Sequence, residues 1–216
     1  ISPEKLDYSI FDVLKGDVPL SRIIKSVSKD GHLDIAPANI DLSRAEIELI
    51  SEINSTYLLK SAITPPFVEP TQGEEPYDFI LTDCPPSLGI LSVNALAASD
   101  YVIIPIQPEM YALQGLGALE TTIEKVRTRA NPSLAVLGWV ITLHDGRTRV
   151  HKDVAEFFRK KFGPTLFNTI ITVNTTIREA QAAKKTVFQY DSAKSGAKNY
   201  AALVEEILQR IGERDG

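Results

Sequence analysis

Apolar residues in the first third of the chain recur at helical spacing, but only in short stretches. Two short helices are predicted around residues 10–14 and 23–27, separated by turn signals at Gly16 and Pro19. A brief strand is predicted over 32–36. Ser43 and Glu46 then have the spacing of a capping box, which predicts a helix over 43–60. Its core face is expected to carry Ile47, Ile50, Ile53, Tyr57 and Leu58.

From residue 77 onward, apolar runs alternate with amphipathic stretches. The runs predict strands over 77–82, 101–106, 135–143 and 166–172. The stretches predict helices over 88–98, 112–129, 150–162 and 195–211. This order predicts an α/β fold of three layers, with a mainly parallel sheet covered by helices on both faces and sites at the carboxyl ends of its strands.

The domain organisation follows from length and from proline. The 216 residues suit a single domain over 1–216, and residues 64–76, with four of the 13 prolines, are predicted to be a surface loop. The chain begins with Ile1 and its one methionine is Met110, so we expect the domain to be incomplete at its N-terminus.

Composition excludes several classes of protein. One cysteine excludes an internal disulfide and a cysteine-ligated zinc site within one chain. The apolar runs are shorter than the ~20 residues of a membrane-spanning helix, so we expect a cytoplasmic protein without a membrane partner. A net charge of -5 argues against attraction of the whole surface to nucleic acid, although a local basic patch is compatible with it.

Candidate chemistry begins at Asp83, directly after the run 77–82 and before Cys84-Pro85-Pro86-Ser87. A carboxylate at a strand end, followed by a rigid double proline, suits a Walker B aspartate that holds Mg²⁺ through water. The alternative is that Asp83 caps the helix beginning near Ser87, and the residues alone leave both open. Cys84 has no basic neighbour to activate it as a nucleophile.

A phosphate site also needs a glycine-rich loop with a lysine. No Gly-Lys dipeptide occurs in the sequence, so the motif G-x-x-x-x-G-K-[ST] is not present. In a P-loop fold this loop follows the first strand. We therefore expect it upstream of Ile1.

One long stretch carries a family resemblance. Residues 77–126, YDFILTDCPPSLGILSVNALAASDYVIIPIQPEMYALQGLGALETTIEKV, resemble the middle of the ParA-type partition ATPases, the deviant-Walker P-loop family that also contains MinD. The resemblance continues through 142–148 and 190–197 and covers nearly the whole chain. It implies a P-loop NTPase fold of the deviant Walker A class, whose N-terminal strand and P-loop are absent from this sequence.

The resemblance also implies roles for single residues. Asp83 and Pro85 fall on the Asp-x-Pro-Pro switch that is ordered around Mg²⁺ and the γ-phosphate of ATP, and Asn174 falls near the adenine. Arg147 matches an arginine that binds DNA without sequence preference, whereas from the residues alone it is a solvated loop charge. A second DNA-binding arginine of close relatives aligns with Thr176, so DNA contact is predicted either to move to Arg178, Lys184 and Lys185 or to be weaker than in those relatives.

The implied function is DNA segregation. ATP and Mg²⁺ would hold two copies as a homodimer that binds non-specific DNA on the nucleoid, and a ParB-like partner would trigger hydrolysis and release of a plasmid or chromosome. The chain as given is expected not to hydrolyse ATP. The alternative is a non-catalytic ParA-like interaction module that heterodimerises through residues 107–117.

Other charged groups favour structural interpretations. His144, Asp145 and His151 are a poor metal set, because the first two fall in a turn and the third begins a helix. Arg159, Lys160 and Lys161 suit the negative end of a helix dipole.

Overall fold

The computed structural model describes residues 6–28, 33–64, 77–109 and 112–215. The chain divides into two compact units, Ile1–Asp100 with Thr121–Leu134, and Tyr101–Glu120 with Ala135–Gly216. The prediction of one domain over 1–216, incomplete at its N-terminus, stays a prediction. Of the predicted loop 64–76, only Thr64 lies within the described residues, where it follows the end of a helix.

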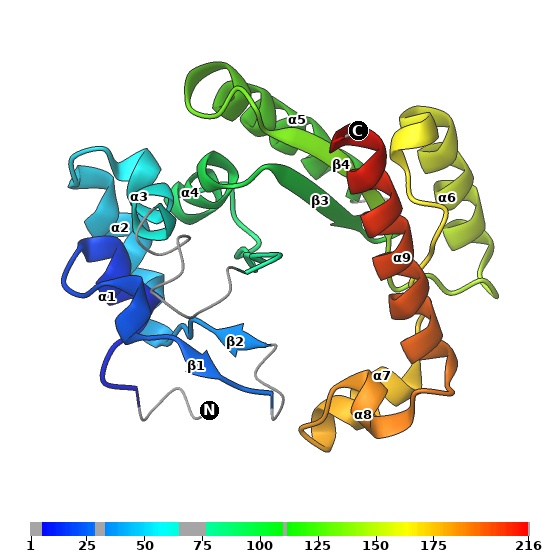
Figure 1. Ribbon diagram of the computed structural model, residues 1–216. Coiled ribbons are helices and arrows are strands. Elements are labelled where there is room, and N and C mark those ends of the chain that lie inside the picture. Colours follow the sequence, from blue (N-terminus) through cyan, green and yellow to red (C-terminus); the bar gives the residue numbers. More distant parts are fainter. Residues whose placement is uncertain (1–5, 29–32, 65–76, 110–111, 216) are drawn as a thin grey trace. The chain divides into compact units, whose positions relative to one another are not determined.

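Short helical elements and one hairpin make up the first unit (Figure 1). In chain order they are α1 (Ile10–Lys15), η2 (Leu20–Arg22), β1 (Lys25–Ser26), β2 (Asp34–Ile35), η3 (Ile40–Arg44), α2 (Ala45–Glu48), η4 (Leu49–Ser51), η5 (Ser55–Tyr57), α3 (Leu58–Ile63) and α4 (Ile90–Ala98).

Helix α1 begins and ends at residues suited to those positions. The Ser9 hydroxyl accepts a hydrogen bond from the Phe11 N–H at 3.3 Å, and the Asp12 carboxylate accepts one from the Ser9 N–H at 2.7 Å. This reciprocal pair is a capping box. Gly16 ends the helix at φ 82, which a residue without a side chain adopts readily. The first predicted helix is therefore confirmed.

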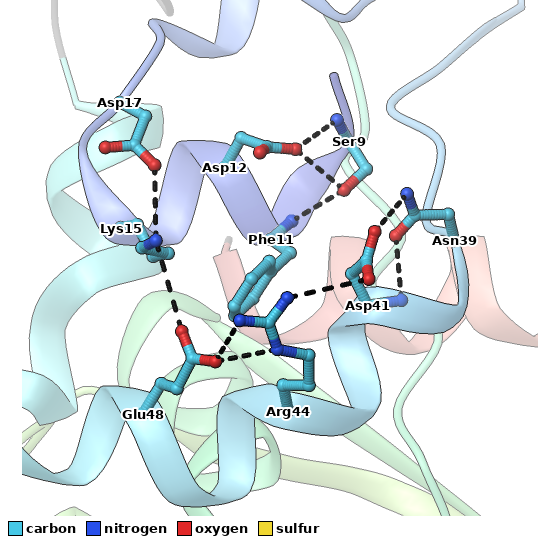
Figure 2. Close-up of polar contacts among 9 residues, drawn as sticks. All are labelled: Ser9, Phe11, Asp12, Lys15, Asp17, Asn39, Asp41, Arg44 and Glu48. Carbon is cyan, nitrogen blue, oxygen red and sulfur yellow. Dashed lines mark hydrogen bonds and ion pairs between the residues drawn. The ribbon is translucent and has the colours of Figure 1, made fainter. Parts of the chain in front are cut away.

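A cluster of charges joins α1 to α2 (Figure 2). Arg44 donates to the Glu48 carboxylate from Nε at 2.7 Å, and Lys15 Nζ lies 4.0 Å from the same carboxylate. Both cations lie over the Phe11 ring, 5.5 and 5.6 Å from its centroid. Beneath them Phe11 packs with Leu14, Ala45 and Leu49 in a buried cluster.

The continuous helix predicted over 43–60 is wrong. The chain forms η3, α2, η4, η5 and α3 instead, and Asn54 interrupts them with a left-handed conformation at φ 58. Asn39, rather than Ser43, supplies the side-chain cap, accepting from the Asp41 N–H at 3.1 Å. Asparagine tolerates left-handed backbone and caps helices well, so these two residues override the apolar period.

The core face predicted for that helix is wrong for its three isoleucines, whereas Leu58, also predicted there, packs against the buried cluster of Phe11 and Leu49. Ile47, Ile50 and Ile53 are 80%, 63% and 87% exposed, whereas Ala45 and Leu49 are fully buried. Because the helix is broken, the 3.6-residue period that placed the isoleucines on one buried face does not run through the segment.

The second predicted helix, around 23–27, is a hairpin strand. After η2, β1 pairs antiparallel with β2, with Lys25 opposite Ile35 and Ser26 opposite Asp34. Branched side chains at Ile24 and Val27, which flank β1, favour extended backbone. The strand predicted over 32–36 is confirmed over Asp34–Ile35.

Buried asparagines fix α4 within the first unit. Asn94 is 1% exposed; its Nδ2 donates to the Ser55 carbonyl at 2.6 Å and its Oδ1 accepts from the Leu59 N–H at 3.1 Å. Asn131 donates to the carbonyls of Leu96 and Ser99 at 3.0 and 2.7 Å. Buried polar groups with all these partners stabilise a unique packing of the helix.

The second unit is built on a parallel strand pair. Its elements are β3 (Tyr101–Ile106), β4 (Ala135–Ile141), α6 (Arg149–Phe162), η6 (Gly163–Thr165), α7 (Thr175–Ala182), α8 (Val187–Asp191) and α9 (Ser195–Asp215). Helix α5 (Ala112–Arg129) is shared, because its last turns belong to the first unit. β3 pairs with β4 from Tyr101 opposite Ala135 to Ile106 opposite Ile141. The strand predicted over 166–172 does not form a continuous ladder. These residues run parallel to β4 and the residues after it, and they pair in two isolated bridges, Trp139 with Leu166 and His144 with Thr172.

Helices cover both faces of this pair. Leu137 and Val140 pack with Leu203, Ile207 and Ile211 of α9. Trp139, the neighbour of Val140 along the strand, stacks on Phe162 of α6 with ring centroids 4.2 Å apart. Figure 1 shows α7 and α8 beside the beginning of α9. The predicted parallel order and the predicted helices 112–129, 150–162 and 195–211 are confirmed here within a few residues.

The strand predicted over 77–82 is wrong for the structure as described. These residues belong to no helix or strand, and Phe79, Ile80 and Leu81 are 55%, 50% and 92% exposed. An apolar run forms a strand only where a neighbouring strand pairs with it, and no described strand does so here. Within the described parts of the chain, no helix is long and apolar enough to span a bilayer.

Candidate functional site

Asp83 lies at the end of the exposed run 77–82 and is itself exposed. Within the described structure its carboxylate has no hydrogen bond or ion pair. The interpretation of Asp83 as a helix cap is wrong, because α4 begins only at Ile90, after Gly89, and the carboxylate that accepts the Ile90 N–H at 3.1 Å is that of Glu46. Asp83 therefore has no structural partner among the residues that the structure describes.

The residues after Asp83 form a compact turn. The Ser87 N–H donates to the Pro85 carbonyl at 2.8 Å, and Ser92 Oγ donates to the Ser87 carbonyl. Partial desolvation of the sulfur, the larger cause, and the nearby Asp83 carboxylate raise the pKa of the Cys84 thiol above its ordinary value. A raised pKa disfavours the reactive thiolate, in line with the interpretation that Cys84 is not a nucleophile.

Asn174 has a structural role in the second unit. Its Oδ1 accepts from the Thr176 N–H at 2.8 Å, which caps α7, and its Nδ2 donates to Ser195 Oγ at 2.6 Å. The cap joins the beginnings of α7 and α9. The predicted contact of Asn174 with a nucleotide is untested and stays a prediction.

Arg147 lies in the loop between β4 and α6, and its side chain is 87% exposed. It forms a two-pronged pair with Asp145, from Nε to Oδ1 at 2.9 Å and from Nη2 to Oδ2 at 2.7 Å. The Arg147 backbone N–H adds a third bond to Oδ1 at 3.0 Å. The hydrogen bonds from Arg147 hold the pKa of the Asp145 carboxyl well below its usual range.

The loop of Arg147 and the start of α7 leave the same edge of the sheet. The Val173 N–H donates to the His144 carbonyl at 3.1 Å, and the His144 N–H donates to the Ile171 carbonyl at 3.1 Å. Because these two segments run parallel, Arg147 and Asn174 follow neighbouring carboxyl ends. This is where α/β folds place ligand sites.

Three further cations lie on α7 or directly after it. Arg178, Lys184 and Lys185 are exposed, and none forms an ion pair with any residue that the structure describes. The Lys185 and Lys184 N–H groups donate to the carbonyls of Ala180 and Gln181, both at 3.0 Å, and Lys184 has φ 54. This is the Schellman geometry of a helix end, and it fixes the backbone of both lysines.

The histidines beside this loop have structural partners. His151 Nδ1 accepts from the Asp145 N–H at 2.9 Å, and the carboxylate of Asp145 is occupied by Arg147. Desolvation first, and then the charges of His151 and Arg159, lower the pKa of His144. At the end of α6, Lys160 pairs with Glu156 at 2.8 Å and Lys161 lies over the Phe162 ring.

Comparison with known proteins identifies the family. A family model described as "AAA domain" matches residues 1–136. The chromosome partitioning protein ParA of Caulobacter vibrioides is 38% identical over 207 residues, which cover 96% of this chain and 74% of that protein. Soj of Bacillus subtilis, a sporulation initiation inhibitor protein, is 37% identical over 96% of this chain and 79% of its own length.

This chain belongs to the ParA/Soj family of partition ATPases. The recognition made from residues 77–126 is thereby confirmed.

Solved structures place this ParA-family chain in the P-loop fold class of ParA and MinD. A putative plasmid partition protein from Borrelia burgdorferi bound to AMPPNP matches with a TM-score of 0.76 and 26% identity over 97% of this chain and 76% of that one. A Mycobacterium smegmatis protein named cobyrinic acid a,c-diamide synthase, with bound ADP and magnesium, matches with a TM-score of 0.68 and 35% identity over 81% and 67%. MinD of Pyrococcus furiosus, 22% identical, shares the fold.

Two contacts near predicted site residues, one in each unit, were not identified from the sequence. Glu46 was assigned to the cap of its own helix, although its partners lie more than forty residues later. Asp145 was considered only as a metal ligand, although an aspartate two residues before an arginine in a turn is a signal for their pairing. The region 107–117 includes Met110 and Tyr111, which lie outside the described residues.

Proposed function

We propose that this chain serves ATP-dependent segregation of a plasmid or chromosome. In this proposal two copies dimerise around ATP and Mg²⁺, the homodimer binds DNA of the nucleoid in the cytoplasm without sequence preference, and a ParB-like partner triggers hydrolysis and release. Membership of the ParA/Soj family supports it. The observation that carries it is the set of exposed cations that follows the carboxyl ends of β4 and of the run 166–172.

Asp83 and Pro85 serve the nucleotide in this proposal. An exposed carboxylate without a partner in the described structure fits Mg²⁺, which binds through one or two carboxylates and retains water. When bound, the metal neutralises charge that develops on the phosphates. Asp83 would hold the metal through water, Pro85 would keep the switch stiff, and Asn174 would lie near the adenine. The proposal includes the full three-layer sheet, in which residues 77–82 pair with a strand that the described residues do not supply.

The 216 residues alone are proposed not to hydrolyse ATP. Phosphoryl transfer depends on positioning and charge neutralisation by a lysine-containing loop, and the sequence has no such motif. Release of phosphate from Mg²⁺-ATP by the purified chain tests this point. Turnover that disappears in Asp83→Asn would contradict it.

Arg147, Arg178, Lys184 and Lys185 are proposed to contact DNA phosphates. A guanidinium with free N–H groups suits phosphate oxygens, and such contacts carry affinity without base recognition. Arg178, Lys184 and Lys185 have no competing ion pair among the described residues, so their charge is available to a polyanion.

A mobility-shift titration of Arg147→Ala with random-sequence duplex DNA tests the DNA surface. We expect weaker binding and a slope of log affinity against log salt reduced by about 1, as for the loss of one phosphate contact. Arg127→Ala is the matched control, because Arg127 is an exposed arginine of α5 paired with Glu124 and lies outside the proposed surface. Equal affinity and equal slope for Arg147→Ala and the wild type would remove Arg147 from the surface.

A further inference from the structure

Glu46 contacts the segment that follows Asp83. Its Oε2 accepts the Ile90 N–H at 3.1 Å and its Oε1 accepts the Ser87 hydroxyl at 3.3 Å. A Cβ atom at Gly89 would overlap this carboxylate, so the residue between the two contacts has to be glycine for Glu46 to stay in place. One side chain of α2 thereby holds the residues that join the Asp83 turn to α4.

A second set of bonds fixes the same junction from within α4. Asn94 Nδ2 donates to the Ile90 carbonyl at 2.9 Å while it also holds the Ser55 carbonyl. Ser92 Oγ donates to the Ser87 carbonyl. Ile90 is thus held at its N–H by Glu46 and at its carbonyl by Asn94. The junction is anchored in the packed part of the first unit.

The residues between the junction and Asp83 are stiff. Pro85 and Pro86 have fixed φ angles, and proline also restricts the residue before it, which is Cys84. The Ser87 N–H closes back on the Pro85 carbonyl at 2.8 Å. Because the connection from Ser87 to Asp83 is short and stiff, the orientation of the Ser87 backbone determines the orientation of Asp83.

We propose that Glu46 is a positioning residue that orients Asp83 through the Ser87–Ile90 junction. This inference rests on the proposed function in one respect, namely that Asp83 binds a ligand. The carboxylate of Glu46 also lies at the positive end of the α4 dipole, which favours a negative charge there. Glu46 touches neither ligand nor reacting atoms, and it acts through Ser87, Gly89 and the two prolines.

The test uses Cys84, the one cysteine in the sequence, as a natural reporter next to Asp83. A nitroxide spin label on Cys84 reports the motion of the turn, and amide exchange of Ile90 reports the hydrogen bond to Glu46. In Glu46→Ala we expect Ile90 to exchange about tenfold faster, as for loss of a hydrogen bond to a charged acceptor, and the label spectrum to narrow. Glu46→Gln keeps an acceptor oxygen, so its Ile90 exchange rate and its Cys84 label spectrum should both lie close to those of the wild type.

Two further variants separate positioning from general stability. Glu48→Ala removes a carboxylate from the same helix, where it pairs with Arg44 and Lys15, and should leave the Ile90 exchange and the Cys84 spectrum unchanged. Gly89→Ala displaces the Glu46 carboxylate sterically and should reproduce the effect of Glu46→Ala without changing Glu46.

The outcomes that overturn the inference are specific. Faster Ile90 exchange in Glu46→Ala with an unchanged Cys84 spectrum would show that Glu46 only caps α4 and does not orient Asp83. Equal effects of Glu46→Ala and Glu48→Ala would show loss of stability instead of positioning. Neither measurement uses nucleotide or DNA, so failure of the proposed function would appear in the mobility-shift and hydrolysis assays and would leave this result standing.

Discussion

Two apolar runs of equal length have different structures in this chain. Residues 77–82 and β3 are both six residues long, and both predict a buried strand. β3 pairs with β4 along its whole length, and Ile104 and Ile106 are each 5% exposed. In 77–82, Leu81 is 92% exposed and no ladder forms with the described strands. An apolar run therefore indicates the capacity for a strand, and the neighbouring strand decides whether it forms.

The comparison extends to two aspartates, one after the exposed run and one after β4, the strand that pairs with β3. Asp83, after 77–82, has no partner in the described structure, whereas Asp145, in the loop after β4, is held by Arg147 through two side-chain bonds. Under the proposed function, the first carboxylate would hold Mg²⁺ through water. The second already neutralises a cation that is a candidate for DNA binding.

Matched leucine truncations should show the largest contrast between the two regions. Leu137→Ala in β4 removes a side chain that is 1% exposed, and we expect a loss of ~2–5 kcal/mol in the free energy of unfolding. Leu81→Ala should change it by less than ~0.5 kcal/mol, because an exposed leucine has little packing to lose. Urea denaturation measures both. Equal losses would show that residues 77–82 are packed, contrary to the comparison.

The elements that were predicted correctly are those whose signal is local and long. Helix α5 matches the predicted 112–129 because five turns of apolar period outweigh any single residue, and β3 matches 101–106 because its partner strand lies within the sequence. The roles of Asp83 and of the cations after β4 rest on predicted strand-end position and family resemblance, and they stay predictions.

The rest depended on tertiary contacts or on short signals. The partners of Glu46 lie in another element, so its capping-box spacing was misleading, and the isoleucines from Ile47 to Ile53 lost their common face when Asn54 broke the helix. Helix α8 was missed, although the Thr186 and Gln189 spacing that forms its capping box is visible in the sequence.

Substitution of the two aspartates should produce a smaller contrast, measured as DNA binding without nucleotide. Asp145→Asn removes the carboxylate that competes with phosphate for Arg147, and we expect affinity to rise roughly two- to fivefold, because exposed ion pairs are weak competitors. Asp83→Asn, which breaks no bond within the described structure, should leave DNA affinity unchanged. Lower affinity in Asp145→Asn would mean that Asp145 positions Arg147 instead of blocking it.

The low pKa of Asp145 defines the pH range of this competition. A carboxyl whose pKa is lower in the folded than in the unfolded chain stabilises the fold above its unfolded pKa, and this contribution is lost only as the pH falls through the folded value. The pair with Arg147 is therefore intact at neutral and mildly acidic pH, where DNA binding is measured.

Amide hydrogen exchange of the purified chain tests the contrast between the two runs most directly. Backbone N–H groups of residues 79–82 should exchange at nearly the rate of an unstructured peptide, while those of Ile103, Ile104 and Ile106 should be protected by about a hundredfold or more. Equal protection of both segments would contradict the account, because residues 77–82 would then be a paired strand and Asp83 would end a completed sheet.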